Sequence, residues 1–252
     1  MVRCLSISVA FHLLRCRLFP FTLQNTGAKK GHVARKRNKN KIALEERKLM
    51  LNFFLITIQF LSGAVMYSHI IAKIKGIDLR KIRDGNPGSS NLWRAAGWKY
   101  GFPALMLDYF KGTFPIAFFV WNESFHVNRY VIAFAALSGI LGHAFSPFLK
   151  FKGGKAIATT FGAWSVLTKW EGPIVLGTVF TIFSILHRLR GKNKTTPEED
   201  AFRVMIGFAA LLIYTMWKVF NGMPELAILY FGNFLIVFYK HRLELRRYLK
   251  GV

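Results

Sequence analysis

A lysine- and glycine-rich segment, Lys-Phe-Lys-Gly-Gly-Lys at residues 150–155, lies between two apolar stretches of the chain. Two adjacent glycines allow backbone amides to come close to a ligand, and the lysines place ammonium groups around it. This chemistry suits an anion such as phosphate, so we predict that Lys152, Gly153, Gly154 and Lys155 bind one. A lysine cluster that only fixes membrane topology would account for the lysines but not for the glycines.

A second candidate anion-binding loop, Asp-Gly-Asn-Pro-Gly-Ser-Ser-Asn, covers residues 84–91. Its Asn-Pro-Gly sequence is typical of a turn in which successive amides point to one side. The residues that follow are good N-cap types for a short helix over 92–96, whose positive end would face the same anion. An ordinary capped turn at a membrane surface is the alternative. The predicted phosphate-binding residues of this loop are Gly85, Asn86, Gly88, Ser89 and Arg94.

The composition indicates a membrane protein. Hydrophobic residues make up 52% of the 252 residues, the mean hydropathy is +0.28, and 19% of residues are charged, against about a quarter in soluble domains. We therefore predict an all-α polytopic membrane protein with about seven transmembrane helices, of which 156–168 and 224–239 fall short of the roughly 20 residues that cross a bilayer unaided. The apolar stretches are 51–72, 97–121, 130–149, 156–168, 172–187, 204–220 and 224–239.

The distribution of basic residues predicts the orientation of these helices. If the side that holds the two glycine-containing loops is cytoplasmic, the cytoplasmic segments after residue 50 contain twenty Lys and Arg and the opposite loops contain three. Cytoplasmic loops are enriched in Lys and Arg. We therefore expect both loops and the C-terminus to be cytoplasmic.

The first 49 residues do not fit this orientation. Residues 1–48 carry twelve Lys or Arg and two Glu, yet the topology places them on the opposite side. We predict two parts, a basic N-terminal extension at 1–49 and a transmembrane domain at 50–252. A start codon assigned too early, with Met50 as the true start, explains the extension; a targeting segment with an apolar part at 6–14 is the alternative. Both cysteines, Cys4 and Cys16, lie in this extension.

Several classes of chemistry are excluded by residue type. The segment after residue 49 has no cysteine, and the seven histidines are scattered without metal-ligand spacing, so we expect no metal and no cofactor. No histidine is followed by aspartate five positions later, which excludes a His-x4-Asp pair in which histidine acts as a base and aspartate orients it. The basic residues are concentrated in the loops on one predicted side of the membrane and do not form a patch on one face of a soluble domain, so nucleic acid is not an expected partner.

Three motifs together resemble those of the bacterial acyl-phosphate:glycerol-3-phosphate acyltransferases. They are Gly-Asn-Pro-Gly-Ser-Ser-Asn at 85–91 with Arg94, the run from Gly142 through Phe-Lys-Gly-Gly-Lys at 151–155 to Thr159, and the tail from 240 to 251. The resemblance implies a seven-helix enzyme of the bacterial inner membrane. Such an enzyme transfers a fatty acyl group from acyl phosphate to the 1-hydroxyl of sn-glycerol 3-phosphate, giving lysophosphatidic acid and phosphate in phospholipid synthesis. It implies acyl phosphate, glycerol 3-phosphate and the lipid bilayer as partners, and leaves the oligomeric state open.

The chemistry of the two loops agrees with this resemblance, and we hypothesise the following roles within the site. Arg94, Lys152 and Lys155 would hold phosphate while the glycerol hydroxyl attacks the acyl group directly. The residues expected to orient the reacting groups are Ser90, Asn91, His143 and His241, and Arg242 is carried over as a phosphate-binding residue. His143 as a general base is an alternative role.

The chain departs from the family pattern at several positions. Asp84 stands where the family has serine, Glu244 where it has asparagine, and Lys240 where it has arginine. Asp84 would repel phosphate unless it turns away or is protonated. The changed last motif fits an alternative function, a non-catalytic transporter or regulatory protein that binds a phosphorylated metabolite. Asp108 and Lys111, inside an apolar stretch, would neutralise each other, mark a polar pathway, or place Lys111 near the phosphate loop.

Overall fold

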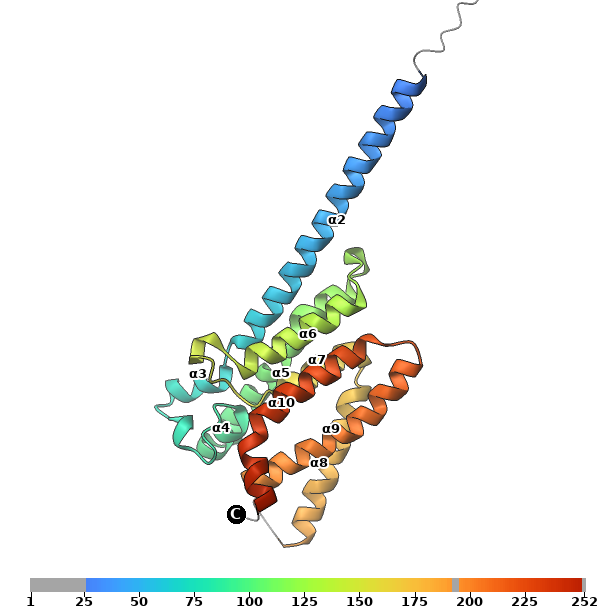
Figure 1. The fold of residues 1–252 in the computed structure, drawn as a ribbon. Helices are drawn as coiled ribbons and strands as arrows, with labels where there is room; N and C mark the ends of the chain where they lie inside the picture. Colours follow the sequence, from blue (N-terminus) through green and yellow to red (C-terminus); the bar gives the residue numbers. More distant parts are fainter. Residues whose placement is uncertain (1–25, 192–194, 251–252) are drawn as a thin grey trace, which may run out of the picture. The chain divides into compact units, whose positions relative to one another are not determined.

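The computed structural model describes residues 26–191 and 195–250, which form α-helices and short 3-10 helices and no β-strand. The predicted all-α class is confirmed. The predictions for Cys4, Cys16 and the apolar part at 6–14 lie outside the described residues. The α-helices are α2 (Thr26–Ala64), α3 (Tyr67–Ile74), α4 (Ser89–Ala96), α5 (Trp98–Trp121), α6 (Arg129–Ala144), α7 (Ile157–Thr168), α8 (Glu171–Leu189), α9 (Pro197–Phe220) and α10 (Glu225–Lys250) (Figure 1).

The chain divides into two compact units, residues 1–49 and 50–252. In the first unit the structure describes a helix from Thr26 onward, and the side chains of residues 35–49 are exposed. That the extension results from an early start codon or is a targeting segment stays a prediction. The second unit contains the remaining helices and all of the residues that concern the candidate site.

Most residues of the seven predicted apolar stretches lie in α-helices, but 51–72 crosses the break between α2 and α3, and 130–149 extends beyond the end of α6 at Ala144. In the described part of the chain, four segments are long and apolar enough to cross a membrane, namely Arg35–Ile74, Arg129–Leu149, Glu171–Leu189 and Pro197–Phe220. The apolar helix Ile157–Thr168 is shorter. Large apolar side chains such as Phe53, Phe114 and Phe220 stay exposed on helices, as expected where lipid replaces water. The protein is therefore a polytopic helical membrane protein, and the count of seven spans stays a prediction.

The first predicted span, 51–72, is not one continuous helix. Helix α2 ends at Ala64 and α3 begins at Tyr67, so the chain changes direction between them. A helix end leaves carbonyl groups without partners inside the helix. The Val65 carbonyl accepts a hydrogen bond from Lys111 of α5, and the Ala64 carbonyl accepts one from Ser146 at 2.6 Å.

Lys111 also pairs with Asp108, one turn earlier in α5, at 2.8 Å. Both side chains are only 1% exposed, and Ser68 donates a further hydrogen bond to Asp108 at 2.8 Å. Isolated charges would be costly at this depth, so the mutual pairing explains how both are tolerated. The interpretation that the two residues neutralise each other is confirmed, and Lys111 contacts the α2–α3 break and not the phosphate loop.

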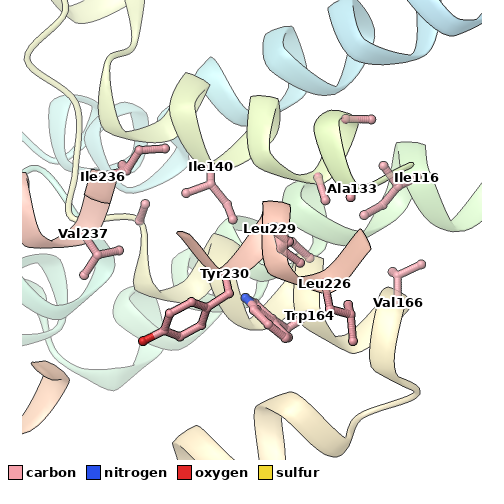
Figure 2. Close-up of a cluster of buried hydrophobic side chains, with 14 of the residues drawn as sticks. Ile116, Ala133, Ile140, Trp164, Val166, Leu226, Leu229, Tyr230, Ile236 and Val237 are labelled. Carbon is pink, nitrogen blue, oxygen red and sulfur yellow. The ribbon is translucent and has the colours of Figure 1, made fainter. Parts of the chain in front are cut away.

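The core of the second unit is built around α7. Trp164 of α7 is completely buried, and Figure 2 shows it beside Leu226 and Tyr230 of α10. Helix α5 approaches α7 so closely that a Cβ atom on Gly162 would lie 2.1 Å from the Tyr109 carbonyl oxygen. Small residues permit such close helix packing in membranes. The packing fixes α5, α7 and α10 relative to one another, and these helices carry much of the candidate site.

Candidate active site

The structure brings the two predicted loops together. Lys155 of the second loop lies 2.7 Å from the carboxylate of Asp84 in the first loop. Arg80 donates one hydrogen bond to the Gly85 carbonyl at 3.2 Å and another to the Lys152 carbonyl, so it joins the two loops. Both loops therefore lie at the same end of the helices and border one cavity, as predicted.

The cavity has a volume of about 410 Å³ and combines polar and apolar walls. Of the predicted residues, it is lined by Asn86, Gly88, Ser89, Ser90, Asn91, Arg94, His143, Lys155 and His241. The predicted residues that do not line it are Gly85, Lys152, Gly153, Gly154 and Arg242. Sequence reasoning did not assign to the site the polar residues Arg83, Tyr109, Asp200 and Arg203, or the apolar residues Leu105, Met106, Phe161, Phe180 and Val204.

Asn91 organises the first loop. Its side-chain nitrogen lies 2.8 Å from Asp84 Oδ1 and 3.0 Å from the carbonyl oxygens of Ile82 and Asn86. The side chain is buried, so these contacts replace its hydrogen bonds to water. Helix α4 begins at Ser89 with Gly88 as its N-cap. The prediction that a serine or asparagine side chain caps this helix is therefore wrong.

The two glycines of the second loop allow it to pack against His143. The Gly154 amide donates to the His143 carbonyl at 3.0 Å. A Cβ atom on Gly153 would lie 2.0 Å from that carbonyl oxygen, and one on Gly154 would lie 2.3 Å from His143 Nε2. Lys240 of α10 donates to the Gly153 carbonyl at 2.9 Å. This geometry explains the glycines by packing and does not support the prediction that both amides cradle phosphate.

Two buried histidines line the cavity and differ in their partners. His143 Nδ1 lies 3.1 Å from the Thr159 hydroxyl. Neither ring nitrogen of His241 has a hydrogen-bond partner in the described part of the chain, although the side chain is buried. Buried polar groups are normally hydrogen-bonded. His241 is therefore available to bond a molecule in the cavity.

Asp84, Lys155 and Glu244 form a group that we call the lysine triad. Lys155 Nζ lies 2.7 Å from Asp84 and 3.0 Å from Glu244, and none of the three side chains is more than 13% exposed. Burial acts to raise the pKa of Asp84, but Lys155 and hydrogen bonds from Asn91 and the Asn86 amide outweigh it and lower the pKa to about 2. Asp84 is thus ionised and neutralised by Lys155, and Lys155 is not the unpaired cation that the sequence suggested.

Three arginines form a second charged group, which we call the arginine cluster: Arg83, Arg94 and Arg203. They surround the carboxylate of Asp200, at 2.8 Å from Arg83, 3.7 Å from Arg94 and 3.0 Å from Arg203. They come from the position just before the first loop, from α4 and from α9. The sequence signals available for the missed members were the position of Arg83 next to the first loop and the acidic run 198–200 that opens an apolar stretch.

This fold and cavity define a helical membrane protein with a cation-rich site that opens beside an apolar wall. Residues 53–251 match the family described as glycerol-3-phosphate acyltransferase, and the chain belongs to that family.

Two relatives illustrate the similarity. A glycerol-3-phosphate acyltransferase from Thermosipho melanesiensis is 33% identical over 69% of this chain and 82% of its own length. One from Aquifex aeolicus is 41% identical over 45% of this chain, and the matched region spans 58% of that relative. The fold is also similar to crystal structures of PlsY, an integral membrane glycerol 3-phosphate acyltransferase. Its glycerol 3-phosphate form has a TM-score of 0.64 and 28% identity, covering 79% of this chain and 92% of that one.

Proposed function

We propose that the protein transfers a fatty acyl group from acyl phosphate to the 1-hydroxyl of sn-glycerol 3-phosphate, giving lysophosphatidic acid and inorganic phosphate. The family assignment supports acyl transfer to glycerol 3-phosphate. A glycerol 3-phosphate form and a lysophosphatidic acid form have been crystallised for PlsY, to which the fold is similar. The acyl phosphate donor follows from the resemblance of the three motifs.

One observation carries this proposal: a single cavity joins cationic side chains to an apolar wall. The cationic part contains the arginine cluster, and the apolar part contains Leu105, Met106 and Phe161. A molecule that has both a phosphate and a hydrocarbon chain fits these two surroundings. Acyl phosphate and lysophosphatidic acid are both molecules of this kind.

The reaction needs no covalent intermediate on the protein. The glycerol hydroxyl oxygen attacks the acyl carbonyl carbon, the bond from that carbon to the phosphate oxygen breaks, and the departing phosphate takes the hydroxyl proton. The contribution of the protein is to hold two anions side by side and to stabilise the charge that develops. In this scheme Arg94 binds phosphate, His143 and Ser90 orient the reacting groups, and His241 bonds the acceptor. Asn91 is a positioning residue that shapes the first loop.

The location of the reaction follows from the charge bias of the sequence. The segments that carry the two loops are rich in Lys and Arg, and such segments stay in the cytoplasm. We therefore place the site at the cytoplasmic leaflet of a bacterial inner membrane, where it receives glycerol 3-phosphate from the cytosol and acyl phosphate from the bilayer.

Membranes that contain the full chain test this function. Radiolabelled palmitoyl phosphate and glycerol 3-phosphate are supplied without acyl-CoA, and lysophosphatidic acid is measured. We expect product from the wild-type chain and a loss of about 10- to 100-fold in Arg94→Ala, because a charge-assisted contact to phosphate is removed. Arg190→Ala, an exposed arginine at the end of α8, is the matched control and should keep full activity. Bound substrate without lipid product would contradict the proposal and favour a binding protein.

A further inference from the structure

Positive charge is distributed unevenly around the cavity. In the lysine triad, two carboxylates at 2.7 and 3.0 Å surround a single ammonium group. In the arginine cluster, three guanidinium groups surround the single carboxylate of Asp200. A phosphate group that enters the cavity is therefore attracted to the arginine cluster and not to the lysine triad.

Residues that are not part of the arginine cluster hold two of its guanidinium groups in place. Arg83 donates to the Thr195 carbonyl at 2.7 Å, which connects the position just before the first loop to the segment just before α9. Arg203 donates to the Ser184 hydroxyl at 3.3 Å and lies 5.4 Å from the centre of the Phe180 ring. These contacts keep two arginines near one another without using all of their donors.

Arg203 retains an unused donor. Its Nε atom is buried and has no hydrogen-bond partner within the described residues. A buried N–H group without a partner is unfavourable. Since Arg203 lines the cavity, a phosphate oxygen bound there would supply the missing acceptor. The planar guanidinium fork is also well suited to bind two phosphate oxygens at once.

We propose that Arg83 and Arg203 join Arg94 in a phosphate subsite, and that Asp200 is an internal competitor that holds the guanidinium groups together until phosphate binds. This proposal rests on the proposed function, in which both substrates carry phosphate. The subsite recognises the phosphate of either glycerol 3-phosphate or acyl phosphate. Without phosphate, Asp200 holds the arginines together. When phosphate enters, the negative charge of Asp200 repels it.

Binding of glycerol 3-phosphate and of inorganic phosphate to the purified full chain in detergent, followed by calorimetry, tests the subsite. Arg203→Gln should weaken binding about 10- to 100-fold, because a charge-assisted hydrogen bond is lost. Asp200→Asn should strengthen binding several-fold, because the competing negative charge is removed while the side-chain shape is kept. A purely structural role for Asp200 predicts weaker binding, so weaker or unchanged binding in Asp200→Asn overturns the proposal.

Arg247→Gln is the matched control. Arg247 pairs with Glu198 at 2.8 Å, also at the start of α9, but it does not line the cavity. Its substitution breaks an arginine–carboxylate pair of the same type and should leave phosphate binding unchanged. Thermal unfolding of each variant shows which ones fold. If Arg203→Gln does not fold, Arg83→Gln replaces it with the same expected loss of affinity.

Steady-state kinetics identifies which phosphate the subsite binds. In Arg203→Gln, a raised KM for glycerol 3-phosphate alone assigns the acceptor, and a raised KM for acyl phosphate alone assigns the donor. Unchanged binding and unchanged KM values in a folded Arg203→Gln protein overturn the subsite but leave the enzymatic function intact. If no lipid product forms in any condition, while phosphate binding still falls in Arg203→Gln and rises in Asp200→Asn, the subsite stands and the enzymatic function fails.

Discussion

Asp84 and Lys155 of the lysine triad border the same cavity as the arginine cluster, but the two groups use charge in opposite ways. In the triad, carboxylates outnumber the cation, and the three side chains are no more than 13% exposed. In the cluster, cations outnumber the carboxylate, and the side-chain exposure of Arg94 reaches 40%. A buried group with balanced or excess negative charge stabilises the position of the chain, whereas an accessible group with excess positive charge is suited to bind an anion.

The comparison indicates that the basic residues of the lysine triad and those of the arginine cluster have different roles, although the sequence does not distinguish them. Lys155 belongs to the glycine-containing loop, yet its ammonium group pairs with Asp84 and Glu244, which lie 71 and 89 positions away along the chain. Arg203 lies outside the three motifs, yet it lines the cavity with an unused donor. If this division is correct, removing a cation from the triad should affect stability most, and removing one from the cluster should affect binding most.

The largest expected effect is that of Lys155→Met. This substitution leaves the carboxylates of Asp84 and Glu244 close together, buried and without their shared cation, which costs about 3 kcal/mol of unfolding free energy. Chemical unfolding in detergent micelles measures the loss. The triple variant Asp84→Asn/Lys155→Met/Glu244→Gln removes all three charges and should recover most of the stability. A single variant as stable as the wild type would show that the triad is not a structural group.

The triad also predicts how stability depends on pH. The pKa of Asp84 is about 2 in the folded protein and 3.8 ordinarily, so Asp84 stabilises the fold above pH 4 and this contribution is lost as pH falls toward 2. The full contribution is about 2 kcal/mol. Between pH 6 and pH 3, unfolding free energy should fall by about 1 kcal/mol less in Asp84→Asn than in the wild type. Equal pH dependence in the two proteins would contradict the pairing.

Features that depend on neighbouring residues in the chain could be predicted from the sequence, whereas contacts between distant segments could not. Local patterns predicted the helices, the two anion-type loops and their meeting on one side, together with Arg94 and His143 at the cavity, and the resemblance of the last motif added His241. The break after Ala64 was missed because no proline or charge marks it, and the carbonyl groups it frees are satisfied by Lys111 and Ser146 from distant segments. The arginine cluster around Asp200 was also missed, because its three arginines come from separate segments of the chain and no local pattern brings them together.

Because Asp84 and Glu244 are far apart in the sequence, each could be noticed singly but the two could not be recognised as a pair. Each departs from the family pattern, and taken alone each adds a negative charge beside a phosphate site. Only the folded chain shows that both contact Lys155. The triad is therefore an arrangement in which two substitutions compensate through one cation, and it accounts for departures that favoured a non-catalytic protein when they were considered one at a time.

A smaller effect on stability is expected in the arginine cluster. In Arg203→Gln, Asp200 keeps its contact with Arg83 at 2.8 Å, so no carboxylate is left alone. Because the cluster is partly solvated, the loss of unfolding free energy should be about 1 kcal/mol or less. Unfolding in detergent, beside Lys155→Met, gives a direct ranking of the two groups. A loss in Arg203→Gln as large as that in Lys155→Met would remove the distinction between a structural group and a binding group.

The smallest effect is expected at Arg247, which pairs with Glu198 outside the cavity. The Arg247 side chain is 50% exposed, so water already solvates much of its charge. Exposed pairs contribute about 0.2–1 kcal/mol, and Arg247→Gln should therefore lower the unfolding free energy by about 0.5 kcal/mol or less. Since Arg247 and Arg203 both bind carboxylates at the start of α9, a defect common to both variants would come from this helix end. A defect in phosphate binding confined to Arg203→Gln would come from the cavity.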